Sequence, residues 1–333
     1  MRSAVVLMGV LAVGLATPGF TQSRTSSFES VTEQHVLDST TQTEDVKFKN
    51  DGADRMTVSV ELSGTGPYRF LVDTGADRTA LSTELANRLQ LPRGTAAKLH
   101  SVAGVQNVET ATISSLRLTS KSIRVANAPL LSEYHMGADG ILGVDSLKSQ
   151  RVMFDFKAKT MSIVPSEQRL LPEDKDKDTI VITARQRNGR LVLTKARAEG
   201  MPVAVVLDTG SQVTIGNTAL RNRLVRGYRS GVERLGKVSL RSVTGEELIG
   251  EYMVIKKLEI GGATLTNLSV VFADAHTFAQ LQLDKGPAML LGMNAMRAFD
   301  RVSIDFASKK LRLLMPEHSS NDVKFASRLS WLR

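Results

Sequence analysis

Short stretches of alternating apolar and polar residues recur along the chain, which is the pattern of strands that bury one face. Met56 to Leu62 and Lys310 to Leu313 alternate in this way. Thr179 to Thr183 is instead an unbroken run rich in β-branched residues, which predicts a strand buried on both faces. Gly and Pro residues interrupt the chain between such segments. The pattern therefore predicts a mainly β protein.

The two halves of the chain repeat the same motifs in the same order. The second copy lies 135 residues after the first at Asp73 and Asp208, and 150 residues after it at Arg151 and Arg301. A constant order with slowly growing offsets indicates duplication followed by loop insertions. The four matched pairs of segments are Phe70–Ala76 with Val205–Ser211, Leu99–Gly104 with Leu240–Gly245, Ile141–Asp145 with Leu290–Asn294, and Arg151–Phe156 with Arg301–Phe306.

Each copy also predicts a short helix after its first motif. Ser82 and Asn217 match between the copies, and both residue types suit an N-cap, because their side chains accept a hydrogen bond from the first helical turn. Leucines spaced four residues apart follow in both copies and form one apolar stripe. We expect one or two short helices in each lobe.

The length of 333 residues exceeds what one compact core usually contains, which favours two domains. A mixed-charge stretch at residues 166–178 cannot bury itself and predicts an interdomain linker. The two lobes are accordingly expected at residues 46–165 and 179–316, and a C-terminal tail at residues 317–333.

The N-terminus predicts export. Arg2 precedes an apolar run from Ala4 to Ala16, which has the length of a signal-peptide core and is too short to span a bilayer. We therefore expect a signal peptide at residues 1–23, a polar tether or pro-segment at residues 24–45, and a periplasmic or secreted location. The alternative is an uncleaved anchor, the one case in which a membrane contact is expected.

Composition argues against several other functions. The net charge is +9, but the Lys and Arg residues are scattered and not interleaved with aromatics, so we expect no nucleic-acid partner. The absence of Cys excludes disulfides, thiolate metal sites and a Cys nucleophile. The five His residues are dispersed, without HExxH, and no GxSxG occurs. We expect neither a metal nor a cofactor.

The repeated Asp-Thr-Gly motif carries the candidate chemistry. In each copy an apolar run delivers an Asp, Asp73 or Asp208, to the end of a predicted buried strand, and the Gly allows a tight turn. Two-fold packing of the copies would bring both carboxylates to the axis. Two adjacent carboxylates share one proton, so one can activate a water while the other donates a hydrogen bond to a scissile carbonyl.

The motifs resemble those of the aspartic protease family. Asp73 to Asp77 is similar to the retroviral (retropepsin) form of the catalytic motif, and Asp208 to Ser211 is similar to the pepsin form. Ile141 to Gly143 and Leu290 to Gly292 resemble the apolar-apolar-Gly motif that packs beneath the catalytic loop. The resemblance covers roughly residues 50–316, and one chain carries both halves of the site, as in bacterial retropepsin-like proteins with tandem domains.

The resemblance implies two homologous β-barrel-like lobes related by a pseudo-two-fold axis, an extended peptide substrate, and a monomer that is sufficient for activity. It implies a catalytic dyad of Asp73 and Asp208; supporting loops of Thr74, Gly75, Ala76, Thr209, Gly210 and Ser211; flaps at Val102, Ala103, Gly104, Val243, Thr244 and Gly245; and a motif beneath the loops of Ile141, Leu142, Gly143, Leu290, Leu291 and Gly292.

Two features depart from the family pattern. Val144 and Met293 stand where the retroviral triplet is followed by an Arg, which leaves the role of Asp77 open. Neither flap candidate contains the Tyr of pepsins. The predicted function is an aspartic endopeptidase, and the alternative is a catalytically inactive peptide-binding or structural module with the same fold.

One asymmetry leads to an electrostatic prediction. Ala76 and Ser211 occupy equivalent positions, and a hydroxyl at Ser211 could donate a hydrogen bond to the neighbouring carboxylate and lower its pKa. This predicts that Asp208 holds the charge more readily and that Asp73 more often carries the shared proton, with an optimum at roughly pH 4–6.

Overall fold

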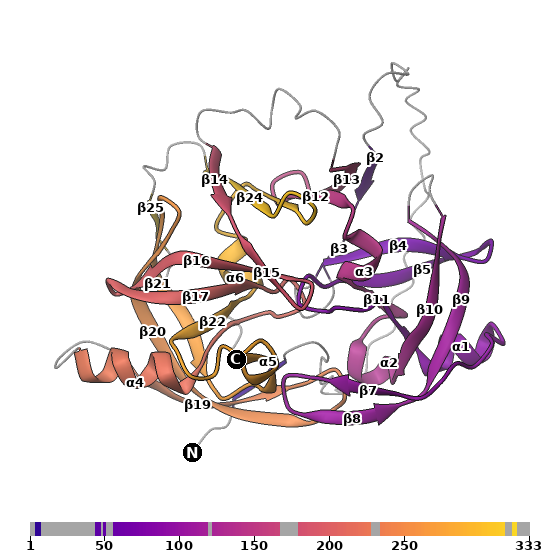
Figure 1. Ribbon diagram of the computed structural model, residues 1–333, viewed down its shortest axis with the longest axis horizontal. Helices are drawn as coiled ribbons and strands as arrows, with labels where there is room; N and C mark the ends of the chain where they lie inside the picture. The colour runs from indigo at the N-terminus through magenta and orange to yellow at the C-terminus, as the bar shows by residue number, and fades with distance from the viewer. Residues whose placement is uncertain are drawn as a thin grey trace, which may run out of the picture.

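The computed structural model describes residues 4–7, 44–47, 49–50, 56–118, 122–166, 179–227, 234–316 and 322–324. The strands form two barrels that lie side by side, with a third sheet joining them at the top of the view in Figure 1. The predicted mainly β class with two homologous lobes is confirmed. Within the described part of the chain, no helix is long and apolar enough to cross a membrane.

The first barrel closes through six strands. They are β4 (Met56–Leu62), β5 (Thr65–Val72), β6 (Ala80–Ser82), β9 (Thr110–Arg117), β10 (Ser122–Leu131) and β11 (Gly140–Leu142). β11 lies between β5 and β6, and β9 pairs with β4 to close the ring. β4 buries Val58, Val60 and Leu62 and exposes Ser59, as the alternating pattern predicts.

The second barrel has the same topology. Its strands are β16 (Arg190–Ala198), β17 (Met201–Leu207), β18 (Thr214–Gly216), β20 (Glu247–Ile260), β21 (Ala263–Phe272) and β22 (Ala288–Leu291). β22 is parallel to β17 as β11 is to β5, and β16 pairs with β20 as β4 pairs with β9. The repeat in the sequence is therefore a repeat in strand order.

Strands from both lobes build the joining sheet. Its order is β14 (Thr179–Thr183), β24 (Lys310–Leu314), β23 (Arg301–Asp305), β12 (Gln150–Asp155), β13 (Thr160–Pro165) and β2 (Glu44–Lys47). The matched segments β12 and β23 pair antiparallel, with Asp155 opposite Arg301 and Arg151 opposite Asp305. Arg301 Nη2 lies 3.0 Å from Asp155 Oδ2, which ties the lobes together by an ion pair.

β14 corrects one expectation. The predicted strand has the expected bounds, but among the described strands it pairs with β24 alone, at the edge of the sheet, and it is not buried on both faces. Ile182 is buried, whereas Val181 is 54% exposed. A β-branched run favours the extended backbone on an edge as well as in a core, so composition alone did not separate the two cases.

The described residues of each lobe form three short helices, one more than the upper expectation. They are α1 (Thr83–Arg88), α2 (Glu133–Met136), α3 (Val144–Leu147), α4 (Thr218–Gly227), α5 (His276–Gln280) and α6 (Met293–Met296). Both predicted N-caps are confirmed: Ser82 Oγ accepts from Leu85 N at 3.0 Å, and Asn217 Oδ1 accepts from Leu220 N at 2.9 Å. The additional helices are single turns of four or five residues.

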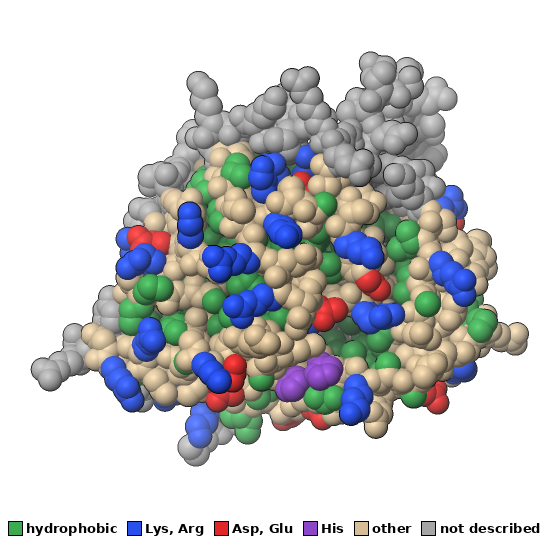
Figure 2. All heavy atoms as spheres, viewed as in Figure 1, with side chains coloured by type: hydrophobic (Ala, Val, Ile, Leu, Met, Phe, Trp, Pro, Cys, Tyr) green, Lys and Arg blue, Asp and Glu red, His purple; other side chains and the backbone are tan. Residues whose placement is uncertain are grey.

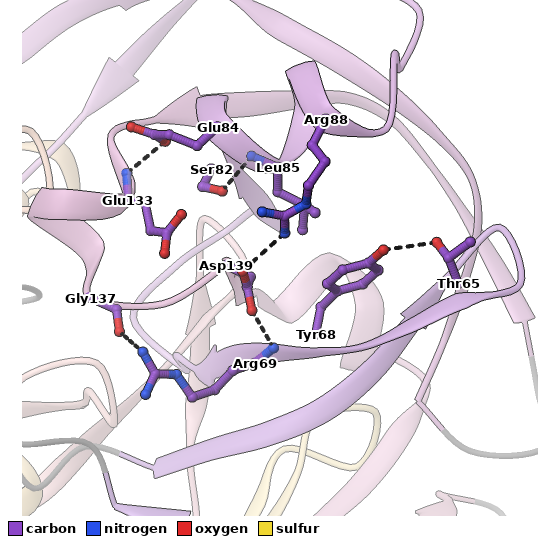
Figure 3. Close-up of polar contacts among 10 residues, drawn as sticks. All are labelled: Thr65, Tyr68, Arg69, Ser82, Glu84, Leu85, Arg88, Glu133, Gly137 and Asp139. Atoms are coloured by element: carbon purple, nitrogen blue, oxygen red, sulfur yellow. Dashed lines mark hydrogen bonds and ion pairs between the residues drawn. The ribbon is translucent and has the colours of Figure 1, made fainter.

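A network of polar contacts joins elements of the first lobe (Figure 3). Asp139 accepts a hydrogen bond from the backbone N–H of Arg69 at 2.7 Å and lies 3.8 Å from the Arg88 guanidinium. Glu84 accepts from the backbone N–H of Glu133 at 2.9 Å. The network joins β5, α1 and α2, so it holds the segment that leads into β11.

The remaining strands extend these sheets. β1 (Ala4–Leu7) is parallel to β19 (Arg234–Arg241), β3 (Lys49–Asn50) pairs with β4, and β25 (Asp322–Lys324) is parallel to β21. The predicted signal peptide, tether, linker and tail lie largely outside the described residues.

Replacing Arg301 with Ala should lower the free energy of unfolding by about 1–3 kcal/mol, because it leaves the partly buried Asp155 without its cation. Arg117→Ala is the matched control. Its partner Glu61 is at the surface, with side chains 51% and 42% exposed against 23% and 17% for the interlobe pair. The control should lose less than about 1 kcal/mol. Equal losses in urea unfolding would contradict the interlobe role of Arg301.

Candidate active site

Asp73 comes directly after β5, and Asp208 comes directly after β17. In each barrel, one strand therefore leads straight into an aspartate. The backbone N–H of Asp73 donates to Leu142 O at 3.1 Å, and that of Asp208 donates to Leu291 O at 3.1 Å. In both lobes a neighbouring parallel strand therefore fixes where the aspartate leaves the barrel.

Two threonines cross-link the loops. Thr74 N donates to Thr209 Oγ1 at 2.9 Å, and Thr209 N donates to Thr74 Oγ1 at 3.1 Å. Each hydroxyl in turn donates to a carbonyl of the opposite lobe: Thr209 Oγ1 to Val72 O at 2.7 Å, and Thr74 Oγ1 to Leu207 O at 3.2 Å. Both threonines are buried, so this exchange of four hydrogen bonds fixes one aspartate relative to the other.

The glycines let the two carboxylates approach. A Cβ on Gly75 would lie 2.6 Å from Asp208 Oδ1, and a Cβ on Gly210 would lie 2.3 Å from Asp73 Cγ. Each glycine thus faces the carboxylate of the other lobe at a distance that no side chain allows. The same glycines orient their own aspartates, because Gly75 N donates to Asp73 Oδ1 at 2.7 Å and Gly210 N to Asp208 Oδ1 at 3.1 Å.

The two apolar-apolar-Gly triplets lie against these loops. Val144 N donates to Ala76 O at 2.9 Å, and Met293 N donates to Ser211 O at 2.8 Å. A Cβ on Gly143 or on Gly292 would lie 2.4 Å from the backbone of the chain that follows each loop, so both glycines are needed for this contact. The structure brings together all the residues that the sequence grouped here.

A second threonine in each lobe completes the support. Thr79 Oγ1 donates to Asp145 Oδ1 at 2.8 Å and accepts from Gly143 N at 3.1 Å. Thr214 does the same in the second lobe, with Asn294 at 2.9 Å and Gly292 at 3.2 Å. An Asp in one copy and an Asn in the other accept equivalent hydrogen bonds, so the scaffold tolerates this difference.

A cavity of about 480 Å³ opens above the two aspartates. On this face Figure 2 shows a hollow with apolar side chains inside it and His, Lys and Arg side chains around its edge. Described residues from both lobes line it, among them Asp73, Asp208, Ile141 and Ser211. Its volume is in the range of small-molecule and peptide side-chain sites.

The two halves of the site match separate family models. Residues 58–149 match the family described as "gag-polyprotein putative aspartyl protease", and residues 194–295 match the family described as "Aspartyl protease". The chain belongs to the retropepsin-like aspartyl protease family. It carries two tandem domains of this family. A comparison with curated proteins finds no match.

The partner of Asp77 comes from the other lobe of the protease. Arg190 Nε lies 3.1 Å from Asp77 Oδ1, and Arg190 is only 5% exposed. Burial raises the pKa of Asp77, and the Arg190 cation opposes that shift. The Arg missing after the triplets is therefore replaced by an Arg that precedes the second motif by eighteen positions, and the ion pair adds another contact between the lobes.

Sequence reasoning missed Arg190, although a local signal was present. Asn188 and Gly189 both have positive φ, 45° and 81°, as in the two-residue turn favoured by Asn-Gly. This turn joins β15 (Arg185–Arg187) to β16 and carries Arg190 to the site. The Asn-Gly pair predicts the hairpin, but nothing in the sequence indicates that its turn reaches Asp77.

The prediction about Ser211 is wrong. Its hydroxyl donates to Val213 O at 2.6 Å, and it is the backbone N–H of Ser211 that donates to Asp208 Oδ1 at 3.1 Å. Burial, together with the nearby Asp73 charge, raises the pKa of Asp208 to about 7, while Arg190 opposes the shift. The Ser211 hydroxyl therefore does not lower the pKa of Asp208, and Ser211→Ala should leave that pKa in place.

The flap candidates lie on two hairpins. Val102, Ala103 and Gly104 form the turn between β7 (Ala97–His100) and β8 (Val105–Val108), and Val243 to Gly245 lie between β19 and β20. Val102 and Val243 line the cavity, whereas Thr244 and Gly245 are not among the described residues that do so. A flap role for these hairpins stays a prediction.

Each hairpin contacts the opposite lobe. The backbone N–H of His276 in α5 donates to Val102 O at 2.8 Å, and the His100 and His276 rings stack with centroids 5.1 Å apart. Gly245 packs on His135 in α2, where a Cβ would lie 2.4 Å from the ring. Gly245 also has a φ of +87°, which side chains rarely adopt. Position 245 therefore requires glycine for its backbone conformation and for its contact with His135, and neither reason involves a substrate.

Thr209→Val should lower the free energy of unfolding by roughly 2–4 kcal/mol, because it removes two buried hydrogen bonds and leaves the N–H of Thr74 without its acceptor. Thr209→Ser keeps the hydroxyl and is the matched control. Denaturant unfolding of both variants measures the difference. A larger loss for Ser than for Val would show that the methyl group, and not the cross-link, carries the effect.

Proposed function

We propose that this protease is an aspartic endopeptidase in which Asp73 and Asp208 activate a water molecule between them. The observation that carries the proposal is the convergence of the two carboxylates beneath a cavity, with the pKa of Asp208 raised to about 7. A buried carboxyl that keeps its proton near neutral pH can donate it, while an ionised neighbour accepts one.

In the proposed mechanism, ionised Asp73 takes a proton from the water, and the resulting oxygen nucleophile attacks the scissile carbonyl carbon. Protonated Asp208 donates to the carbonyl oxygen, so the tetrahedral intermediate is neutral at that oxygen. Asp73 then gives its proton to the leaving nitrogen while ionised Asp208 takes one back from a hydroxyl of the intermediate, so the C–N bond breaks as the carbonyl re-forms and the shared-proton state is restored. The reaction consumes one water and needs no covalent intermediate.

The substrate is proposed to be a peptide in an extended conformation. The cavity is bounded on one side by the aspartate loops and on the other by residues of the two hairpins, among them Leu99, Val102 and Val243. Both aspartates belong to one chain, which supports activity as a monomer. We also propose export to the periplasm or the exterior, for which the apolar run from Ala4 to Ala16 is the support.

The second candidate is a catalytically inactive peptide-binding module. Retention of both aspartates, with the glycines that allow their approach, favours the enzyme. Digestion of an unstructured protein by the purified full chain separates the two candidates, because a binding module gives no cleavage at any pH.

Asp73→Asn and Asp208→Asn should each lower kcat/KM by at least about a hundredfold, because either change removes the shared proton arrangement. Asp284→Asn, an exposed carboxylate outside the cavity, is the matched control and should retain full activity. Circular dichroism checks that each variant is folded. Residual activity near that of the wild type in either site variant would contradict the dyad.

The alkaline limb of the activity profile should lie near pH 7, where ionisation of Asp208 removes the shared proton. The Arg190 cation stabilises ionised Asp208, so Arg190→Gln should raise its pKa and move this limb to higher pH. Lys195→Gln removes an exposed charge outside the cavity and should leave the limb in place. A downward shift for Arg190→Gln would refute the assignment of the proton to Asp208.

A further inference from the structure

The cavity extends mainly over the first lobe, and its wall there is apolar. Ala80, Leu131 and Ile141 belong to one buried cluster, against which Ala76 and Leu99 pack, and all five line the cavity. An apolar side chain of a peptide bound here would be removed from water on several sides.

Two cations border this apolar wall. Arg78 lines the cavity immediately after Asp77, and its Nη2 donates to the carbonyl of Ala126 at 2.8 Å, which holds the guanidinium at the wall. Lys98 lines the cavity from β7. Both residues are exposed, and no carboxylate among the described residues forms an ion pair with either.

The other charged groups that line the cavity sum to one negative charge. Arg190 pairs with Asp77, and Asp73 and Asp208 together carry one negative charge when they share a proton. Arg78 and Lys98 add two positive charges, both on the first-lobe side, and so leave the cavity with a net positive charge. Lys and Arg side chains also surround the hollow on the face shown in Figure 2.

The excess is confined to one lobe. At the repeat offset of this loop, the position equivalent to Arg78 is Val213, which is 4% exposed. At the offset of the hairpins, the position equivalent to Lys98 is Ser239, whose hydroxyl donates to Glu247 at 2.9 Å. The pseudo-symmetric site can therefore distinguish the two ends of a bound peptide by charge.

We propose that the protease selects acidic peptides, in which an Asp or Glu close to an apolar residue is bound by Arg78 and Lys98 on the first-lobe side of the scissile bond. The inference rests on the proposed function and specifies the substrate class of the same site. A guanidinium and an ammonium with free donors bind a carboxylate well, and a neutral isostere forfeits the charge-assisted hydrogen bonds.

The test measures binding separately from cleavage. Fluorescent peptides that differ only in Glu, Gln or Lys beside a Leu are titrated into the folded Asp73→Asn protein, with anisotropy as the readout. Peptides with the variable residue before or after the Leu show at which of the two positions the protein distinguishes Glu from Gln. We expect the Glu peptide to bind about fivefold more tightly than its Gln counterpart in the favourable position, with a preference that weakens as salt rises.

Charge reversal at the two cations provides the decisive comparison. Arg78→Glu and Lys98→Glu, alone and together in the Asp73→Asn background, should abolish the preference for Glu and favour the Lys peptide. Lys195→Glu, an equal charge reversal outside the cavity, should leave the preference unchanged. Equal affinity for Glu and Gln in every position, or the same loss with Lys195→Glu, would overturn the inference.

Cleavage by the protein with both aspartates intact then tests the proposed function alone. If the acidic peptides bind with the expected preference but are not cut at any pH, the endopeptidase proposal fails and the acidic subsite stands. If peptides are cut without regard to charge, the endopeptidase proposal stands and the subsite fails.

Discussion

The site depends on the close approach of two carboxylates, Asp73 and Asp208, that belong to different barrels. Each lobe holds its own aspartate, but the position of one aspartate relative to the other is set by contacts that cross between the lobes. The exchange of hydrogen bonds between Thr74 and Thr209 does this at the loops, because each threonine is held by backbone groups of the other lobe.

Contacts at two further places also join the lobes. In the joining sheet, β12 and β23 pair across the axis, and their repeated Arg and Asp residues face one another. At the cavity, each hairpin contacts a helix of the opposite lobe, α5 for the first and α2 for the second. The lobes are thus joined at a sheet, at the loops and at the hairpins.

The two lobes have the same backbone arrangement at the site, but some of their side chains differ. The ion pair of Asp77 with Arg190 exists on one side, since Gln212 occupies the position equivalent to Asp77. Its cation acts on Asp208 and opposes the rise of that pKa. The two aspartates therefore differ in environment even though their backbones are equivalent.

The sequence by itself determined the features that depend on neighbours along the chain. The sequence predicted the alternation in β4, the N-caps Ser82 and Asn217, and the repeated motifs. It could do so because strand period, helix capping and duplication are local or repeated patterns. The tertiary structure alone decided that Arg190 pairs with Asp77, that the Ser211 hydroxyl bonds Val213 and not Asp208, and that β14 lies at an edge. These depend on which distant groups a side chain meets and on the burial that results, and local composition contains neither.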